Sequence, residues 1–158
     1  MFRRSGVVSA GELESMGLVP PRERLIRGAV AVTECIEEIP CNVCESACPV
    51  KAIRVEGLRG RPRIDWDRCT GCGVCVGVCP GQAMFLLDLS RGAAVTVPYE
   101  FLPRLRRGDT VELLDREGRV VGEGTVIRVF EVNKTQVVTV SVPENLLMEV
   151  RAVRRAAR

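Results

Sequence analysis

Eight cysteines are the residues of this 158-residue sequence with the clearest capacity for chemistry. They fall into two groups with regular internal spacing. The first group reads Cys35-x5-Cys41-x2-Cys44-x3-Cys48 before Pro49, and the second reads Cys69-x2-Cys72-x2-Cys75-x3-Cys79 before Pro80. Thiolates are soft ligands that suit zinc, copper(I) and iron–sulfur clusters, so two such groups predict metal centres.

The spacing of the second group is the one known for bacterial 4Fe–4S centres. Three cysteines two residues apart wrap one loop around three corners of a cubic cluster. A proline restricts the residue before it to extended backbone, so Pro80 directs the Cys79 thiolate away from its own loop. We therefore expect the fourth cysteine of each group to bind the cluster of the other group.

The predicted ligand sets interleave, and no side chain is predicted to be catalytic. Cluster one is expected on Cys35, Cys41, Cys44 and Cys79, and cluster two on Cys69, Cys72, Cys75 and Cys48. Structural zinc fits the triple spacing poorly, and disulfides do not suit a reducing compartment. Cys35 is separated from the next cysteine, Cys41, by a longer gap than the equivalent residue of the second group. Without it, cluster one would have three irons or a non-cysteine ligand.

The elements around the cysteines are expected to be short. Strands are predicted over residues 29–35, 51–55, 63–66 and 83–87. Aligning the two Cys-Pro pairs gives a period of 31 residues, which predicts a pseudo-two-fold repeat of cysteine loop, helical turn and strand. Ahead of this module, Ser9 and Glu12 have the spacing of a capping box that opens a short helix.

Beyond residue 91 the cysteines stop and β-branched residues take over. Strands are predicted at 95–97, 110–114, 120–121, 125–129 and 137–142, followed by a helix over 145–157. Five short strands suggest a small barrel-like domain with Tyr99, Phe101 and Phe130 in its core. The predicted fold class is α+β, with an N-terminal arm (1–28), a two-cluster domain (29–90) and a β-rich domain (91–158).

The net charge of +3 comes entirely from the β-rich region. Residues 1–90 have 11 basic and 11 acidic side chains, whereas residues 91–158 have 12 and 9. The arginines at 104, 106, 107, 151, 154, 155 and 158 are interpreted as a solvated face rather than a nucleic-acid site. No apolar run approaches the roughly 18 residues of a membrane span, and no signal peptide is recognised, so a cytoplasmic location is expected.

With these residues in view, the region from Gly28 to Leu89 resembles a bacterial-type ferredoxin with two 4Fe–4S clusters. The segments 34–45, 79–83 and 97–103 are also similar to small iron–sulfur subunits of FAD-dependent amino-acid dehydrogenases of the proline and hydroxyproline type. That resemblance implies a subunit that passes electrons between the flavin of a partner dehydrogenase and an unidentified acceptor. In that group the Cys-x5-Cys gap is usual, which implies that Cys35 is a ligand.

Functions other than that of an electron-transfer subunit fit the sequence to different degrees. An independent enzyme is disfavoured because the sequence has no histidine, no cysteine outside the two groups and no glycine-rich nucleotide motif. A free-standing soluble ferredoxin stays open. A redox-sensing or nucleic-acid-binding module is the weaker alternative, since aromatic and basic residues do not alternate in the β-rich region.

Overall fold

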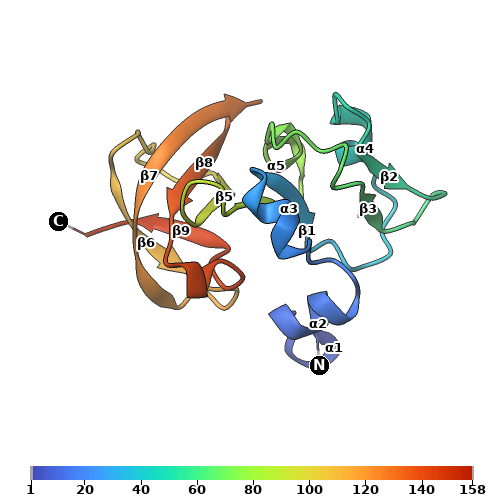
Figure 1. Cartoon of the computed structure of the whole chain (residues 1–158), viewed down its shortest axis with the longest axis horizontal. Helices are drawn as coiled ribbons and strands as arrows, with labels where there is room; N and C mark the ends of the chain where they lie inside the picture. Colours follow the sequence, from blue (N-terminus) through green and yellow to red (C-terminus); the bar gives the residue numbers. More distant parts are fainter. Residues whose placement is uncertain (1, 158) are drawn as a thin grey trace.

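The computed structural model of the protein describes residues 2–157 and shows an α+β fold built on antiparallel strands (Figure 1). Its strands are β1 (Val30–Thr33), β2 (Ile53–Val55), β3 (Pro62–Ile64), β4 (Met84–Asp88), β5 (Ala94–Tyr99), β6 (Thr110–Leu114), β7 (Val120–Val132), β8 (Thr135–Ser141) and β9 (Ala152–Arg155). Its helices are α1 (Phe2–Ser5), α2 (Ala10–Ser15), α3 (Arg22–Ile26), α4 (Val43–Ala47), α5 (Val74–Val78) and the 3-10 turn η1 (Glu144–Leu146). In this part of the chain, no helix is long and apolar enough to cross a membrane.

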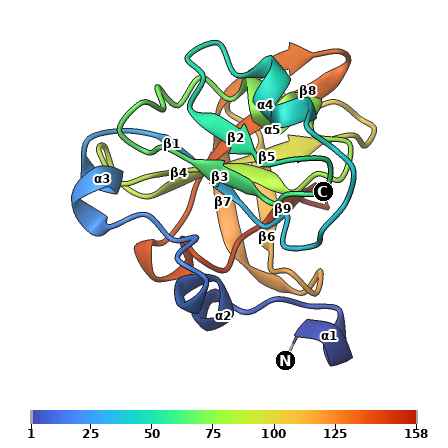
Figure 2. The same ribbon diagram turned by 90° about the vertical axis from the view of Figure 1, so that its right-hand side faces the viewer.

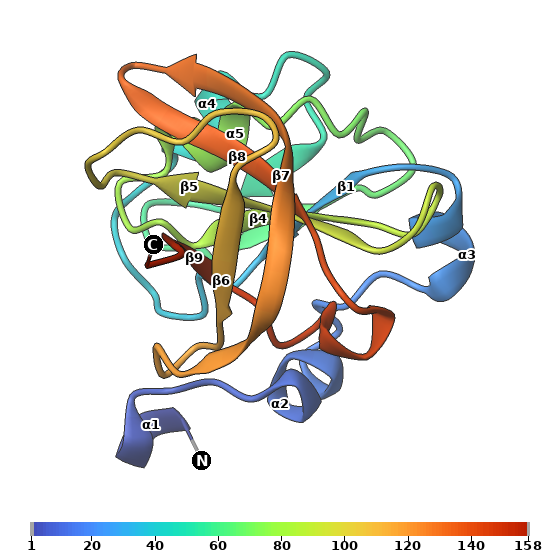
Figure 3. The same ribbon diagram turned by 90° about the vertical axis from the view of Figure 1, so that its left-hand side faces the viewer.

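Seven strands form one sheet in the order β1-β4-β5-β8-β7-β6-β9, and β2 pairs separately with β3. The sheet therefore joins strands from the cysteine-rich region to strands from the β-rich region. Figure 3 shows β6 and the adjoining half of β7 in front, with α4 and α5 behind, and the other end of β7 contacts α5. The predicted boundary at residues 90 and 91 lies in the turn between β4 and β5, and it stays a prediction.

The expected barrel does not close, because β1 and β9 are the two ends of the strand order. Residues 120–121 and 125–129 also belong to one strand rather than two. The first half of β7 pairs with β6 and the second half with β8, with a register shift between Val126 and Arg128. Gly124 permits this bend, because a Cβ there would collide with the backbone oxygen of Ser141.

The prediction of a helix over residues 145–157 is wrong. Only η1 forms, and Ala152–Arg155 instead pairs with β6 as an edge strand. This pairing leaves Val150 at 0% and Val153 at 2% exposure, so burial in the sheet outweighs local helix propensity. Arg151 is correspondingly 6% exposed, which corrects its assignment to a solvated face; Arg154 is exposed, and Arg158 lies outside the described residues.

The core is mainly valine and leucine from the sheet. The largest cluster of buried side chains includes Val95, Val97, Val111 and Leu113, all fully buried. Tyr99 is buried as expected, but Phe101 is 68% exposed because it follows the end of β5, where no strand covers it. Phe130 is partly buried, against the second cluster described below.

A second core cluster connects the cysteine loops to the sheet. It contains Cys44 of α4, Cys75 of α5, Val76, Leu86 of β4 and Val137 of β8. Figures 1 and 2 show α4, α5, β2 and β3 gathered on one side of the molecule, with α4 beside α5. The cysteine-bearing helices are therefore held by the same sheet that organises the rest of the fold.

The first part of the N-terminal arm, up to Val19, packs in a small cluster apart from this core, whereas Leu25 of α3 belongs to the main core. The predicted capping box is confirmed: the Glu12 backbone N–H donates to Ser9 Oγ at 3.2 Å, and the Ser9 N–H donates to Glu12 Oε2 at 3.0 Å. Leu13 of α2 and Val8 pack with Ile36, which lies in the first cysteine loop. The arm therefore covers the segment between Cys35 and Cys41, which is the longest gap within either cysteine group.

Candidate iron–sulfur centres

Two cavities contain the eight cysteines, four in each. The first, of about 580 Å³, has Cys35, Cys41, Cys44 and Cys79 in its wall. The second is smaller and more enclosed, and its wall contains Cys48, Cys69, Cys72 and Cys75. Each cavity thus brings together three cysteines of one group and the last cysteine of the other.

The last cysteine of each group reaches the cavity of the other group because of the backbone at the two Cys-Pro pairs. Cys48 ends α4 with φ −69° and ψ 114°, and Cys79 ends α5 with φ −65° and ψ 114°. Both residues are extended, as expected for a residue before proline. The helix therefore stops at each of these cysteines, and the chain leaves in a new direction that presents the thiol to the neighbouring loop.

Backbone N–H groups point at several cysteine sulfurs. Ala52 N–H donates to Cys48 Sγ at 3.3 Å, and Ala83 N–H donates to Cys79 Sγ at 3.4 Å, four residues along in both cases. Cys69 Sγ accepts from the N–H groups of Ala31 and Gly71, each at 3.4 Å. Such donors stabilise a thiolate, which is the form that binds iron.

Burial favours the protonated form of two of the thiols, Cys44 and Cys75. Burial raises the pKa of Cys75 to about 12, and neighbouring cysteines of its own cavity, Cys69 and Cys72, add to the effect. Burial likewise raises the pKa of Cys44 to about 11, with Cys79 and Cys41 as further causes. Thiols this buried become thiolates only beside a compensating positive charge, such as iron, so the donor sets suit a cluster.

No three His, Cys, Asp or Glu side chains within residues 2–157 are arranged to hold a single metal ion. The four thiolates of a 4Fe–4S cluster each bind a different iron, so they are farther apart than the ligands of one zinc ion.

Cys35 is positioned by β1 and by the N-terminal arm. It lies two residues beyond the end of β1, and its N–H donates to Thr33 Oγ1 at 3.1 Å. The next residue, Ile36, is 6% exposed and packs with Val8 and Leu13. The long gap to Cys41 is therefore anchored at its start, and Cys35 lies in the first cavity with the other three thiols.

Arg24 of α3 holds the second cysteine loop, a role that the sequence did not reveal. Its guanidinium donates to the backbone oxygen of Trp66 at 2.6 Å and to that of Cys69 at 2.9 Å. It also donates to the oxygen of Gly28 at 3.0 Å, and Arg24 is 8% exposed. Other arginines accompany Arg24 in residues 1–28, and no feature of its sequence position distinguishes it from them.

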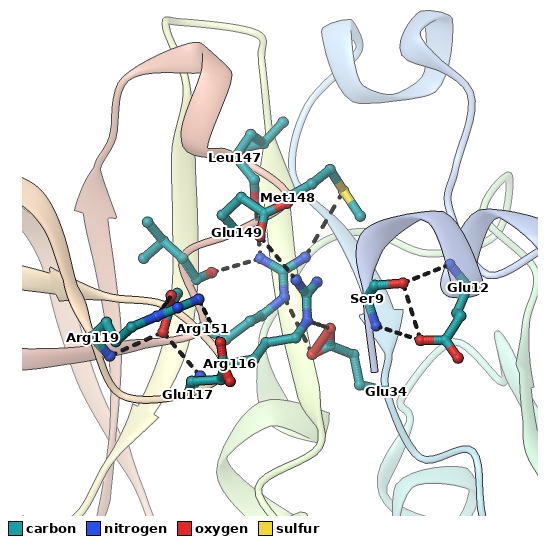
Figure 4. Close-up of polar contacts among 12 residues, drawn as sticks. Ser9, Glu12, Glu34, Arg116, Glu117, Arg119, Leu147, Met148, Glu149 and Arg151 are labelled. Carbon is teal, nitrogen blue, oxygen red and sulfur yellow. Dashed lines mark hydrogen bonds and ion pairs between the residues drawn. The ribbon is translucent and has the colours of Figure 1, made fainter. Parts of the chain in front are cut away.

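A buried group of charges adjoins the first cavity and was also missed. Arg116, from the turn between β6 and β7, donates through Nε to Glu34 Oε1 at 2.6 Å. Arg151 Nε lies 3.3 Å from Glu34 Oε2. Figure 4 shows both guanidinium groups directed at Glu34, which directly precedes Cys35. Burial lowers the pKa of Arg151 to about 10, so this arginine is still charged at neutral pH.

The cysteine-rich region is similar in sequence to known iron–sulfur proteins. Residues 34–83, which contain all eight cysteines, match the 4Fe–4S dicluster domain family. Ferredoxin-type protein NapF of Haemophilus influenzae is 37% identical over 59 residues, 35% of this chain and 34% of that protein. A component of the ion-translocating oxidoreductase complex of Methanosarcina acetivorans is 46% identical over 48 residues, 30% of this chain and 17% of that protein.

Pyruvate synthase subunit PorD of Thermotoga maritima is 38% identical over 63 residues, 39% of this chain and 58% of that protein. The chain thus covers less than two thirds of each of these relatives. No solved structure matches the chain. Residues 34–83 are therefore a ferredoxin-type iron–sulfur segment, and this segment carries two 4Fe–4S clusters.

Proposed function

We propose that the protein is an electron-transfer subunit in which each cluster is bound by three cysteines of one group and one of the other. Cluster one is assigned to Cys35, Cys41, Cys44 and Cys79, and cluster two to Cys69, Cys72, Cys75 and Cys48. The observation that supports this assignment most strongly is the composition of the two cavities, which divide the eight cysteines in this way.

The proximity of the two sites supports electron passage between them. Cys44 and Cys75 belong to the same buried cluster of side chains, and α4 contacts α5. Cys44 and Cys48 also contribute to raising the pKa of Cys75, which places them close to it. An electron that enters one cluster therefore has a short path to the other.

Catalysis is proposed to reside in a partner. The chain has no histidine, and the proposed ligand sets use all eight cysteines, so no imidazole base or free thiol is left for substrate chemistry. Two of the relatives are named as subunits of larger enzymes, an ion-translocating oxidoreductase complex and pyruvate synthase. These names favour a subunit over the alternative, a free-standing soluble ferredoxin.

The partner is proposed to be an FAD-containing dehydrogenase of amino acids, of the proline and hydroxyproline type. This rests on the resemblance of residues 34–45, 79–83 and 97–103 to subunits of such enzymes. A reduced flavin would give up its two electrons one at a time to the clusters, which pass them to an acceptor. The arm (1–28) and the β-rich region (91–158) are proposed to cover the clusters and to contact the partner.

The ligand assignment is tested by two cysteine variants, Cys79→Ser and Cys48→Ser. In anaerobically purified protein, Cys79→Ser should alter the electron paramagnetic resonance signal of the cluster that Cys41→Ser also alters. Cys48→Ser should alter the signal that Cys72→Ser alters. If Cys79→Ser and Cys72→Ser instead affect the same cluster, the interleaved assignment is wrong.

The partner is tested by purification of the tagged protein from its native host without oxygen. A co-purifying flavoprotein that reduces the clusters when an amino acid such as proline is added would support the proposal. A monomer that takes up electrons from no flavoprotein, with both clusters present, would favour a free-standing ferredoxin.

A further inference from the structure

Two arginines from the C-terminal half of the chain reach the first cavity. The side chains of Arg116 and Arg151 are 9% and 4% exposed, and both residues lie in the cavity wall with the four thiols of cluster one. Neither is among the residues around the second cavity. Any charge that they carry therefore acts mainly on one of the two clusters.

The two buried guanidinium groups beside this cavity share one carboxylate. Glu34, 10% exposed, is the carboxylate that both guanidinium groups share. Glu149 lies 3.6 Å from Arg116 Nη1 but is 49% exposed, so water screens it. Asp115, also in the wall, accepts from Arg119 Nε at 2.9 Å and from the backbone N–H groups of residues 117 and 119. Because Asp115 is engaged by Arg119, the guanidinium groups of Arg116 and Arg151 have only one buried carboxylate among the described residues, Glu34, between them.

A donor of this group also has no partner. Within residues 2–157, Arg116 Nη2 is buried and donates no hydrogen bond. Arg151 Nε also makes no hydrogen bond in this part of the chain but lies 3.3 Å from Glu34 Oε2, and Arg151 Nη1 donates to the backbone oxygens of Leu147 at 2.9 Å and Val150 at 2.6 Å. A buried guanidinium donor without a partner is costly, so an anion is expected in front of it.

A 4Fe–4S cluster with four thiolates is such an anion. Its total charge is −2 when oxidised and −3 after it takes up one electron. A fixed positive charge stabilises the more negative state more strongly, and so raises the reduction potential. Because a guanidinium is protonated in both states, no proton needs to accompany the electron.

We propose that Arg116, assisted by Arg151, is a charge-compensating residue for cluster one and makes it the cluster of higher potential. The inference rests on the proposed ligand sets. The turn that carries Arg116 is fixed by the hydrogen bonds of Asp115, so the guanidinium is held in place before the cluster binds. The β-rich region thereby sets the direction of electron flow, from cluster two toward cluster one.

Redox titration of both clusters, followed by electron paramagnetic resonance, tests the proposal. Arg116→Gln should lower the equilibrium constant for reduction of one cluster at least tenfold, which is about 59 mV, and leave the other unchanged. Glu34→Gln should shift the same cluster in the opposite direction, because it removes the negative charge. Arg116→Lys keeps the charge and should shift the potential less than Arg116→Gln.

Arg154→Gln is the matched control. Arg154 lies on β9, is 60% exposed, pairs with Glu112 and is not in the wall of the first cavity, so neither potential should move. The proposal is overturned if Arg116→Gln binds both clusters with unchanged potentials, or if Arg116→Gln and Glu34→Gln shift a potential in the same direction. If the wild-type protein does not bind two clusters, the proposed function fails instead. Should Arg116→Gln not assemble, Glu34→Gln decides by the sign of its shift.

Discussion

Gly71→Ala is predicted to disrupt the second cysteine loop. Gly71 lies between Cys69 and Cys72 with φ +69°, a left-handed conformation that L-residues rarely adopt. A Cβ at this position would collide with the backbone oxygen of Ala29 and lie 2.9 Å from the carbonyl carbon, below the 3.0 Å limit of real Cβ contacts. The neighbouring atoms are backbone, so the loop itself must move.

Two costs add at this position. An alanine in the left-handed region costs about 1–2 kcal/mol. Overpacking against a fixed neighbour costs about 1–3 kcal/mol more. Gly57 separates the two costs, because its φ is +66° and nothing lies within 4 Å of a Cβ built there. Gly57→Ala should therefore show only the first cost, and the difference between the two variants is about 1–3 kcal/mol.

The assay is the thermal unfolding of the two variants under nitrogen, followed by circular dichroism, together with iron content. For a chain of this size 1 kcal/mol corresponds to about 2–4 °C, so Gly71→Ala should melt about 2–12 °C below Gly57→Ala. It should also lose iron from cluster two, because Cys72 follows the displaced residue. Equal melting temperatures and equal iron contents would refute the reasoning.

Three further predictions concern the contacts around the clusters. Arg24→Met should cost at most about 1–3 kcal/mol for each partly buried backbone oxygen left without a donor, and a chelator should remove iron faster than from wild type. The backbone N–H groups of Ser9 and Phe2 donate to Glu12 and lower its pKa. The ionised carboxylate therefore stabilises the arm at any pH above the ordinary glutamate pKa, and this stabilisation is lost as the pH falls through the lowered pKa of Glu12. Amide exchange at Ser9 should report that loss, and Glu12→Gln should abolish its pH dependence. Gly77→Ala places a Cβ 2.6 Å from Val132 Cβ, and overpacking of about 1–3 kcal/mol should outweigh the helix gain of about 1 kcal/mol. A melting temperature of Gly77→Ala above that of the wild-type protein would contradict this prediction.

Features set by neighbouring residues were predicted well from the sequence. The capping box at Ser9 needs only a hydroxyl and a carboxylate three residues apart, and it forms as predicted. The extended backbone of Cys48 and Cys79 follows from the proline after each. Most strands coincide with runs of β-branched residues for the same local reason. The interleaved ligand sets, which depend on these features, remain a proposal.

Features set by distant partners were not predictable in this way. Residues 152–155 have helix-forming neighbours, and pairing with the edge of β6 makes them a strand. Arg151 resembles the other arginines of the tail, but its burial depends on Glu34 and Phe85 from the cysteine-rich half. Arg24 is likewise buried by contacts with loops more than 40 residues away. Such contacts depend on how the sheet assembles, which local spacing does not encode.

The number of irons and acid-labile sulfides per chain, measured in anaerobically purified protein, tests most directly whether the two cavities hold cubic clusters. Two 4Fe–4S clusters predict about eight irons and eight sulfides per chain. A value near four of each would mean that one set of four cysteines does not bind a cluster, and zinc in place of iron would contradict the role in electron transfer.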